Sequence, residues 1–167
     1  MINSKRQLLY GGLSIEDELR VRKIRNGTVI DHIPAGNALT VLKICGISGK
    51  EGNTISIAIN VPSSKAGRKD IVKIEDRELE PQEVDIIAMI APSATINIVR
   101  DFKVVEKNRV KLPKTVKSYP RCINPNCVTN TKEPVEPYFI IRSEEPLRIR
   151  CYYCHIVMDK DDVIKNL

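Results

Sequence analysis

The chain has 167 residues, of which 42% are hydrophobic and 29% charged, and its net charge is +6. Such a composition is typical of a globular protein and argues against wholesale disorder. No apolar stretch approaches the roughly 18 residues that cross a membrane, and the first residues lack a secretory signal. We therefore expect a cytoplasmic protein, whose positive charge either meets an anionic partner or is a surface property without a specific role.

Residues 1–18 show no periodicity and contain a pair of glycines, so we expect a flexible N-terminal tail. Extended structure is predicted for 19–33, where β-branched side chains gather before Pro34. A helix should follow, because apolar residues recur at helical spacing and Asn37 can cap its first turn. The predicted apolar face of this helix consists of Ala38, Leu39, Leu42 and Cys45.

Two strands and a second helix are predicted next. Large aliphatic side chains alternate with other residues at 54–61, the pattern of a half-buried strand, and a further strand at 71–74 follows a basic loop. The helix should begin at Pro81, since proline suits the first helical position, and end before Pro92. Its expected apolar stripe consists of Val84, Ile87, Ala88 and Ala91.

The last strands of this part are predicted at 95–99 and 102–105. The order β-α-β-β-α-β is that of the ferredoxin-like fold, an antiparallel sheet with two helices on one face. We therefore predict an α+β chain whose first domain spans 19–111. Two prolines and little periodicity mark 112–120 as a linker.

A small β-rich domain is predicted for 121–167, with strands at 138–142 and 147–151. It contains two close pairs of cysteines, and two tight turns of this kind can present four thiolates to one zinc ion. The predicted zinc ligands are Cys122, Cys127, Cys151 and Cys154.

Four thiolates close the coordination shell of zinc, so the ion should be structural and supply folding energy to a domain with little core. Disulfides fit the spacing but not the expected compartment, whereas an iron centre of the rubredoxin type would use the same ligands. His155 follows the last cysteine and could exchange with a ligand, although four thiolates already suffice. Cys45 is expected to be a buried apolar residue.

The sequence contains no P-loop, dinucleotide-binding or metalloprotease motif. Neither His32 nor His155 has an obvious nucleophilic partner. We therefore expect a protein without enzymatic activity.

Several polar residues of the first domain could nevertheless bind a ligand. Asp31 could accept hydrogen bonds from a sugar, and Asn97 could contact a base edge. Phosphates could be met by Lys69, Lys73 and Lys107. Each of these residues could equally be an ordinary polar surface side chain.

Several motifs in the chain resemble the regulatory chain of aspartate carbamoyltransferase. They are Gly-Thr-Val-Ile-Asp-His-Ile-Pro at 27–34, Gly-Arg-Lys-Asp at 67–70 with Lys-Ile-Glu at 73–75, Ala-Pro-x-Ala-Thr-x-Asn at 91–97, and the two cysteine pairs. The similarity covers about 19–167.

This resemblance implies a nucleotide-binding allosteric domain joined to a zinc domain, in a non-catalytic subunit of pyrimidine biosynthesis. Regulatory chains of this family pair with themselves through the allosteric domain and dock on the catalytic chain through the zinc domain. CTP and ATP compete for one effector site and shift the enzyme between less and more active states, and UTP is a further candidate. Neither a nucleic acid nor a membrane is an expected partner.

The resemblance also implies roles for individual residues. Asp31 would hold the ribose with His32 beside it, Lys73 would contact the ribose or the base, Lys107 would contact the phosphates, and Asn97 would lie near them. The base edge would be read by the backbone of a short segment, namely Val21, Arg22, Lys23 and Ile24.

The alternative is a basic RNA-binding protein, because RNA-recognition domains have the same strand order and zinc ribbons often contact nucleic acid. Such domains stack bases on aromatic residues of their central strands. Here the segments 54–61 and 94–99 contain no aromatic residue, and Phe102 lies only on an edge segment. These observations favour the regulatory chain.

Overall fold

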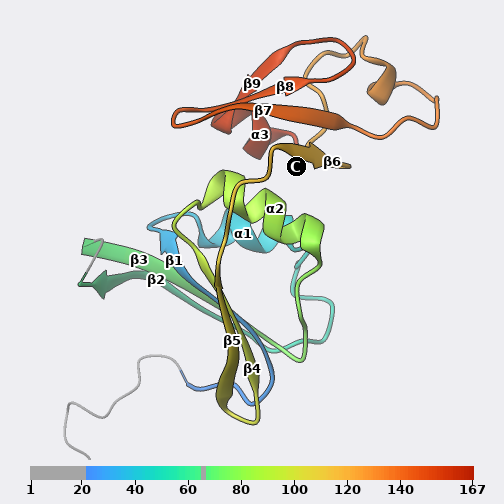
Figure 1. The fold of residues 1–167 in the computed structure, drawn as a ribbon. Coiled ribbons are helices and arrows are strands. Elements are labelled where there is room, and N and C mark those ends of the chain that lie inside the picture. The colour runs from blue at the N-terminus through green and yellow to red at the C-terminus, as the bar shows by residue number, and fades with distance from the viewer. Residues whose placement is uncertain (1–21, 65–66) are drawn as a thin grey trace, which may run out of the picture.

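The structure is a computed structural model that describes residues 22–64 and 67–167 (Figure 1). The predictions made for the tail at 1–18 and for Val21 lie outside these residues. None of the helices in the described part of the chain is long and apolar enough to cross a membrane.

The first part of the chain forms an antiparallel sheet covered by two helices on one face (Figure 1). Its strands are β1 (Gly27–Pro34), β2 (Ile55–Ser63), β3 (Gly67–Glu75), β4 (Thr95–Arg100) and β5 (Lys103–Arg109). Its helices are α1 (Ala38–Ile44) and α2 (Pro81–Ile90). Within the described residues the strand order is β2-β3-β1-β4-β5. The predicted ferredoxin-like arrangement is therefore confirmed, and β5 extends it at one edge.

The helix α1 buries a slightly different face from the predicted one. Leu39 is 65% exposed. Val41, which was not predicted to face the core, is fully buried, as is Ala38, and Leu42 is also buried. Positions i, i+3 and i+4 share a helix face, so Val41 belongs with Ala38 and Leu39 points about 100° away. The prediction for Leu39 was therefore wrong.

The strand β2 also differs from expectation. Ile55 packs against the core, but Ile57 and Ile59 are 40% and 46% exposed. Because β2 is an edge strand of the sheet, the alternating aliphatic face continues beyond the part that the core covers. The strand is thus partly buried, as predicted, but two of its alternating isoleucines are exposed.

A buried carboxylate organises the start of α1. Asp70 in β3 is completely buried, and its Oδ2 accepts hydrogen bonds from the backbone N–H groups of Gly36 (2.8 Å) and Ala38 (3.0 Å). Asn37 stands at the N-cap position as predicted, but its side chain donates to the Pro34 carbonyl instead of capping the helix. The capping acceptor therefore comes from a neighbouring strand.

The Asp70 carboxylate also accepts a hydrogen bond from a β-bulge in β2. One extra residue interrupts the pairing of β2 with β3 between Ala58 and Val61, and Asn60 there has a φ of +58°. The Asn60 N–H donates to Asp70 Oδ1 at 2.9 Å. Such bulges bend a strand and redirect its side chains.

The second part of the chain is built on a smaller sheet. Its elements are β6 (Thr115–Lys117), the 3-10 helix η2 (Val128–Asn130), β7 (Tyr138–Glu144), β8 (Leu147–Cys151), β9 (Val157–Asp159) and α3 (Lys160–Lys165). The strand order is β6-β7-β8-β9 within the described residues, and both predicted strands are present. The segment 112–120 is more than a linker, because Val116 in β6 is 2% exposed and pairs with Phe139.

The helix α2 lies between the two parts of the molecule (Figure 1). Ile87 and Ala88 pack in the core beneath the larger sheet. Ile86, Met89 and Ile90 pack in the second core, together with residues of the smaller sheet. The predicted apolar stripe therefore describes only one of two buried faces of this helix.

Candidate metal centre and ligand pocket

The first cysteine pair lies in a turn that precedes η2. The Cys127 N–H donates to the Asn124 carbonyl (3.0 Å), and the Asn126 N–H donates to Asn124 Oδ1 (3.0 Å), as in an Asx turn. Asn130 closes the turn, because its Nδ2 donates to the carbonyls of Cys122 and Asn124, each at 2.7 Å. The asparagines around Pro125 thus form the expected knuckle.

The second pair lies between β8 and β9. The Cys151 N–H donates to the Ile156 carbonyl (2.9 Å), and the His155 N–H donates to the Cys151 carbonyl (3.1 Å). His155 has a φ of +63°, which closes the turn tightly after Cys154. Its side chain is exposed and lies outside the four-sulfur cluster found among the described residues, so it is a neighbour and not a ligand.

The four sulfur atoms meet in one cluster, all within 4.8 Å of one another. The Cys122 and Cys154 Sγ atoms are 3.5 Å apart, and those of Cys127 and Cys151 are 3.8 Å apart. A disulfide requires about 2.05 Å. Tetrahedral zinc with bonds of about 2.3 Å places its sulfur ligands about 3.8 Å apart. The cluster therefore fits one structural zinc ion and not two disulfides.

Burial raises the pKa of the Cys122 and Cys151 thiols, whereas the surroundings of Cys154 and Cys127 include donors that suit a metal-bound thiolate. Burial opposes ionisation of Cys154, but hydrogen bonds from the Ile156 backbone, the Asn124 side chain and the neighbouring Cys122 and Cys151 thiols together outweigh it and lower the pKa of this thiol to about 7. The Thr129 hydroxyl donates to Cys127 Sγ at 3.2 Å, an outer contact that orients the ligand. Ile149, Met158 and the other core residues of the small sheet shield the cluster.

Cys45, the one cysteine outside the metal cluster, lies in an environment that disfavours its thiolate form. It is 2% exposed within the first core, and burial raises the pKa of its thiol to about 12, with a smaller contribution from Glu83. A thiol with so high a pKa is unreactive. The prediction of a buried apolar residue is confirmed.

A pocket of about 310 Å³ lies on the larger sheet. The residues that line it are Lys23, Ile24, Val29, Asp31, Lys73, Asn97, Val99, Phe102 and Val104. Asp31 and Lys73 alternate along their strands with Ile30, Val72 and Ile74, which are buried in the core beneath the helices. Successive strand residues face opposite sides, so the pocket is on the face of the sheet away from α1 and α2.

The carboxylate of Asp31 is the centre of this pocket's polar contacts. The Lys69 Nζ lies 2.7 Å from Asp31 Oδ1, and the His32 N–H donates to Asp31 Oδ1 at 2.6 Å. The His32 Nδ1 is 3.3 Å from Asp31 Oδ2 in an orientation that makes no hydrogen bond. His32 has a φ of +60° at a bulge in β1, an unusual backbone that persists only where surrounding contacts hold it.

Lys73 and Asn97 are both held by backbone carbonyls. The Lys73 Nζ donates to the Arg22 carbonyl at 2.6 Å, and the Asn97 Nδ2 donates to the Val29 carbonyl at 3.1 Å. Burial lowers the pKa of Lys73, although the Asp31 carboxylate acts in the opposite direction. The Asn97 amide nitrogen is engaged, which leaves its oxygen as the atom able to accept a hydrogen bond from a ligand.

The structure brings most of the predicted effector residues together, but not all. Lys23, Ile24, Asp31, Lys73 and Asn97 line the pocket. Lys107 does not line the pocket. In the pairing of β4 with β5 it lies directly opposite Asn97, so both side chains are on the same face of the sheet. His32 and Arg22 contact residues of the lining, and Val21 is outside the described residues.

Four lining residues were missed from the sequence: Val29, Val99, Phe102 and Val104. Val29 and Val99 lie two positions from Asp31 and Asn97, so strand alternation could have revealed them. Phe102 was predicted to begin a strand, but it lies in the β4–β5 turn with a φ of +63°, where its N–H donates to the Arg25 carbonyl at 2.9 Å. Its side chain is 58% exposed at the pocket.

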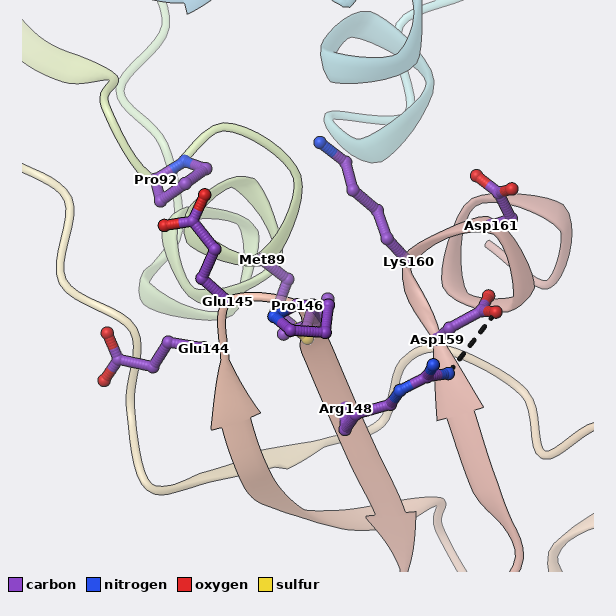
Figure 2. Close-up of a pocket in the computed structure, with 10 residues that line it drawn as sticks. Met89, Pro92, Glu144, Glu145, Pro146, Arg148, Asp159, Lys160 and Asp161 are labelled. Carbon is purple, nitrogen blue, oxygen red and sulfur yellow. Dashed lines mark ion pairs between the residues drawn. The ribbon is translucent and has the colours of Figure 1, made fainter.

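A larger cavity, of about 620 Å³, lies between α2 and the small sheet (Figure 2). None of the predicted effector residues within the described ranges lines it. Its two basic side chains are already engaged, since Arg148 lies 3.5 Å from the Asp159 carboxylate and Lys160 donates to the Ile90 carbonyl. Four carboxylates also line the cavity, those of Glu144, Glu145, Asp159 and Asp161, whereas Asp31 is the one carboxylate among the residues that line the smaller pocket. An anionic ligand is therefore better matched by the smaller pocket.

The fold joins an α+β unit, whose sheet carries the smaller pocket, to a small β-rich unit built around a structural four-cysteine metal centre. Two family models match the chain. Residues 19–111 match "Aspartate carbamoyltransferase regulatory chain, allosteric domain", and residues 114–164 match "Aspartate carbamoyltransferase regulatory chain, metal binding domain".

Similar proteins carry the same description. Aspartate carbamoyltransferase regulatory chains from Thermofilum pendens and Korarchaeum cryptofilum are 58% and 56% identical over 154 residues, which cover 92% of this chain and 97% and 98% of theirs. That of Saccharolobus solfataricus is 53% identical over 154 residues, with 92% of this chain and 97% of the relative covered.

The chain belongs to the family of aspartate carbamoyltransferase regulatory chains. Members are non-catalytic subunits that associate with the catalytic chains of an enzyme of pyrimidine biosynthesis, as the resemblance implied. The structural zinc ion belongs to the metal-binding domain of this family.

Proposed function

We propose that nucleotide effectors bind in the pocket on the larger sheet and change the activity of the catalytic chain through the zinc domain. CTP and ATP are the effectors, and UTP is a further candidate. One observation carries this proposal: the pocket lies on one face of a sheet whose other face packs on α2, and α2 also belongs to the core of the zinc domain.

The pocket offers groups for each part of a nucleotide. Its volume of about 310 Å³ is at the small end for ligand sites, which suits an open groove that leaves the phosphates near solvent. Asp31 can accept hydrogen bonds from ribose hydroxyls, and Asn97 can accept one from an amino group of the base. The exposed ring of Phe102 offers a flat apolar surface on which a base can stack.

The phosphates would meet a ring of lysines. Lys23 and Lys73 line the pocket, and Lys107 lies beside Asn97 on the neighbouring strand. Ammonium groups at the edge of a pocket bind phosphate oxygens by charge-assisted hydrogen bonds. Arg22 contributes its backbone, since its carbonyl already fixes the Lys73 ammonium.

Two regulatory chains would pair through the edge strand β2. Ile57 and Ile59 are exposed there, and an aliphatic edge strand is a template for pairing with another copy. The division of the chain into an allosteric domain at 19–111, a connection at 112–120 and a zinc domain at 121–167 is part of this proposal, as is a cytoplasmic location.

The zinc domain would dock on the catalytic chain through an aromatic surface beside the second knuckle. Tyr152 and Tyr153 are 52% and 39% exposed, and the Tyr152 ring lies 5.2 Å from that of Tyr138. Lys117 stands over the Tyr138 ring at 5.6 Å. Exposed tyrosines are enriched at protein interfaces because they add contact area at low entropic cost.

Calorimetric titration of the zinc-loaded chain with CTP tests the binding step. We expect saturable binding that ATP displaces and that Asp31→Ala weakens, whereas Asp76→Ala, outside the pocket lining, leaves it unchanged. CTP binding that ATP does not displace, or that survives Asp31→Ala at full strength, contradicts the proposed site.

A further inference from the structure

The turn between α2 and β4, residues 90–94, is hydrogen-bonded to both halves of the molecule. At its start, the carbonyl of Ile90 accepts a hydrogen bond from Lys160 Nζ at 2.7 Å. Near its end, the Ser93 hydroxyl donates to the carbonyl of His32 at 2.9 Å. Lys160 belongs to the zinc domain and His32 lies next to the lining of the nucleotide pocket, so one short turn contacts both.

The contact with the zinc domain places the Lys160 ammonium group at the C-terminal end of α2. Carbonyl groups at the C-terminus of a helix carry partial negative charge and favour a nearby cation. Within the described chain, the last turn of α2 contains no basic residue of its own. Lys160, the first residue of α3, supplies the cation from the zinc domain. Figure 2 shows its side chain pointing away from the Arg148–Asp159 ion pair, so it is not part of that pair.

The pocket contact reaches a constrained piece of backbone. His32 lies within the bulge of β1 and has a φ of +60°, and its N–H donates to the carboxylate of Asp31, which lines the pocket. The two contacts fall on the successive peptide groups that meet at His32, so a change in the Asp31 contacts acts on the residue whose carbonyl Ser93 holds.

The turn itself has little freedom to absorb such a change. Ala91 and Ala94 are completely buried. The Ala91 N–H donates to the Ile87 carbonyl (2.7 Å), and the Ala94 N–H donates to the Ala91 carbonyl (2.9 Å). Pro92 and Ser93 are exposed, but the alanines on either side of them are packed and joined by a hydrogen bond, so a shift at Ser93 is passed through them to Ile90.

We infer that Lys160 is a positioning residue for allosteric control. Its hydrogen bond couples the 90–94 turn to the zinc domain, so that a conformational change at the nucleotide pocket is transmitted to the zinc domain. This role rests on the proposed nucleotide site. It predicts that removal of the ammonium group reduces the allosteric response without weakening nucleotide binding to the isolated chain.

The test compares assembled enzymes that contain Lys160→Met, Lys160→Arg or Lys165→Met regulatory chains. Methionine keeps the length of the side chain and removes the donor, arginine keeps a cationic donor, and Lys165 is an exposed lysine of the same helix. We expect Lys160→Met to reduce the CTP-induced change in activity by about two- to tenfold. Lys160→Arg should retain much of the response, and Lys165→Met all of it. Zinc content and the CTP affinity of the free chain should be unchanged in all three.

Hydrogen exchange of the unliganded regulatory chain provides a second readout that does not depend on nucleotide binding. The backbone amides of Ala91, Ser93 and Ala94 should exchange faster in Lys160→Met than in the wild type and the Lys165→Met control. Unchanged exchange in this turn overturns the inference, as does a full CTP response of the Lys160→Met enzyme. A wild-type chain that binds no nucleotide contradicts the proposed function instead, and calorimetry identifies that case.

Discussion

Ile86 and Ile87 are consecutive residues of α2, yet their buried side chains pack into different hydrophobic cores. Consecutive residues of a helix point about 100° apart. Ile87 faces the sheet whose far side forms the proposed nucleotide pocket, and Ile86 faces the zinc domain. A helix buried on two sides cannot shift against one domain without disturbing the other, which gives α2 its place in the proposed mechanism.

The first prediction concerns this helix. Ile86→Ala should lower the free energy of unfolding of the zinc domain by about 2–5 kcal/mol, because the substitution leaves a cavity in its core. Leu39→Ala, at a position 65% exposed in α1, is the matched control and should change it by less than about 0.5 kcal/mol. Urea unfolding of the zinc-loaded chains measures both. Equal effects of the two substitutions would show that α2 does not share the zinc-domain core.

Asp70 should be essential to the geometry of the first domain. Asp70→Asn keeps the size of the side chain but replaces one acceptor oxygen by a donor, which leaves the N–H of Asn60, or those of Gly36 and Ala38, without a partner. The expected loss of stability is about 1–3 kcal/mol per unsatisfied buried group. Thermal unfolding measures this loss, and Asp101→Asn, an exposed site in the β4–β5 turn, serves as the control. A neutral Asp70→Asn would contradict the capping role.

Lys73 should dominate the affinity for nucleotide phosphates or ribose. Lys73→Met is expected to weaken CTP binding by about tenfold or more, as the loss of a charge-assisted hydrogen bond does. The exposed Lys50→Met, outside the pocket lining, should have no effect. Calorimetry measures both affinities.

The same lysine predicts a pH dependence. Burial lowers the pKa of Lys73 below the usual 10.5, although Asp31 opposes this. The ammonium form exists below the pKa, so CTP affinity should be full near neutral pH and decline as pH rises, before 10.5 is reached. Lys73→Met should bind weakly and lose this decline. An identical alkaline decline in the variant would assign the titration to another group.

Zinc should be required for assembly. Chelation of the ion, or Cys151→Ser, is expected to unfold the small domain and abolish association with the catalytic chain, because metal binding supplies its folding free energy. Cys45→Ala is the control, since this cysteine is remote from the cluster and buried in the first core. Sedimentation of the mixed chains measures assembly. Full assembly after complete zinc removal would refute the docking role of the zinc domain.

The edge strand β2 should mediate self-association. Ile59→Lys places a charge on the exposed aliphatic edge and should convert a regulatory dimer into monomers. Val105→Lys makes the matched change on β5, at the opposite edge of the sheet, and should leave the dimer intact. Light scattering of the isolated chain decides between the two edges, and dissociation by Val105→Lys alone would assign the dimer to β5.

Local patterns predicted most of the elements. The cysteine spacing identified the metal centre, because both knuckles are formed by hydrogen bonds within a few residues of sequence. The strand order of the first domain followed from periodicity and from Pro81 and Pro92, which mark the limits of α2. Such features depend on neighbours along the chain and can be read without knowledge of the fold.

Features that depend on distant contacts were missed. The second buried face of α2 exists only because the zinc domain packs on it, and the short strand β6 in the predicted linker forms only by pairing with β7. The cap of α1 comes from Asp70, 32 residues beyond Ala38. Phe102 joined the pocket because the β4–β5 turn folds against Arg25. No local propensity contains this information.

The central claim is that nucleotide binding on one face of the sheet reaches the catalytic chain through this regulatory chain. The most direct measurement is the aspartate carbamoyltransferase activity of the catalytic chain, alone and assembled with the zinc-loaded regulatory chain, during titration with CTP and with ATP. The account predicts a saturable change in activity in the assembled enzyme, lost with the Asp31→Ala chain, and no change in the catalytic chain alone. Identical, nucleotide-independent activity in both preparations would contradict it.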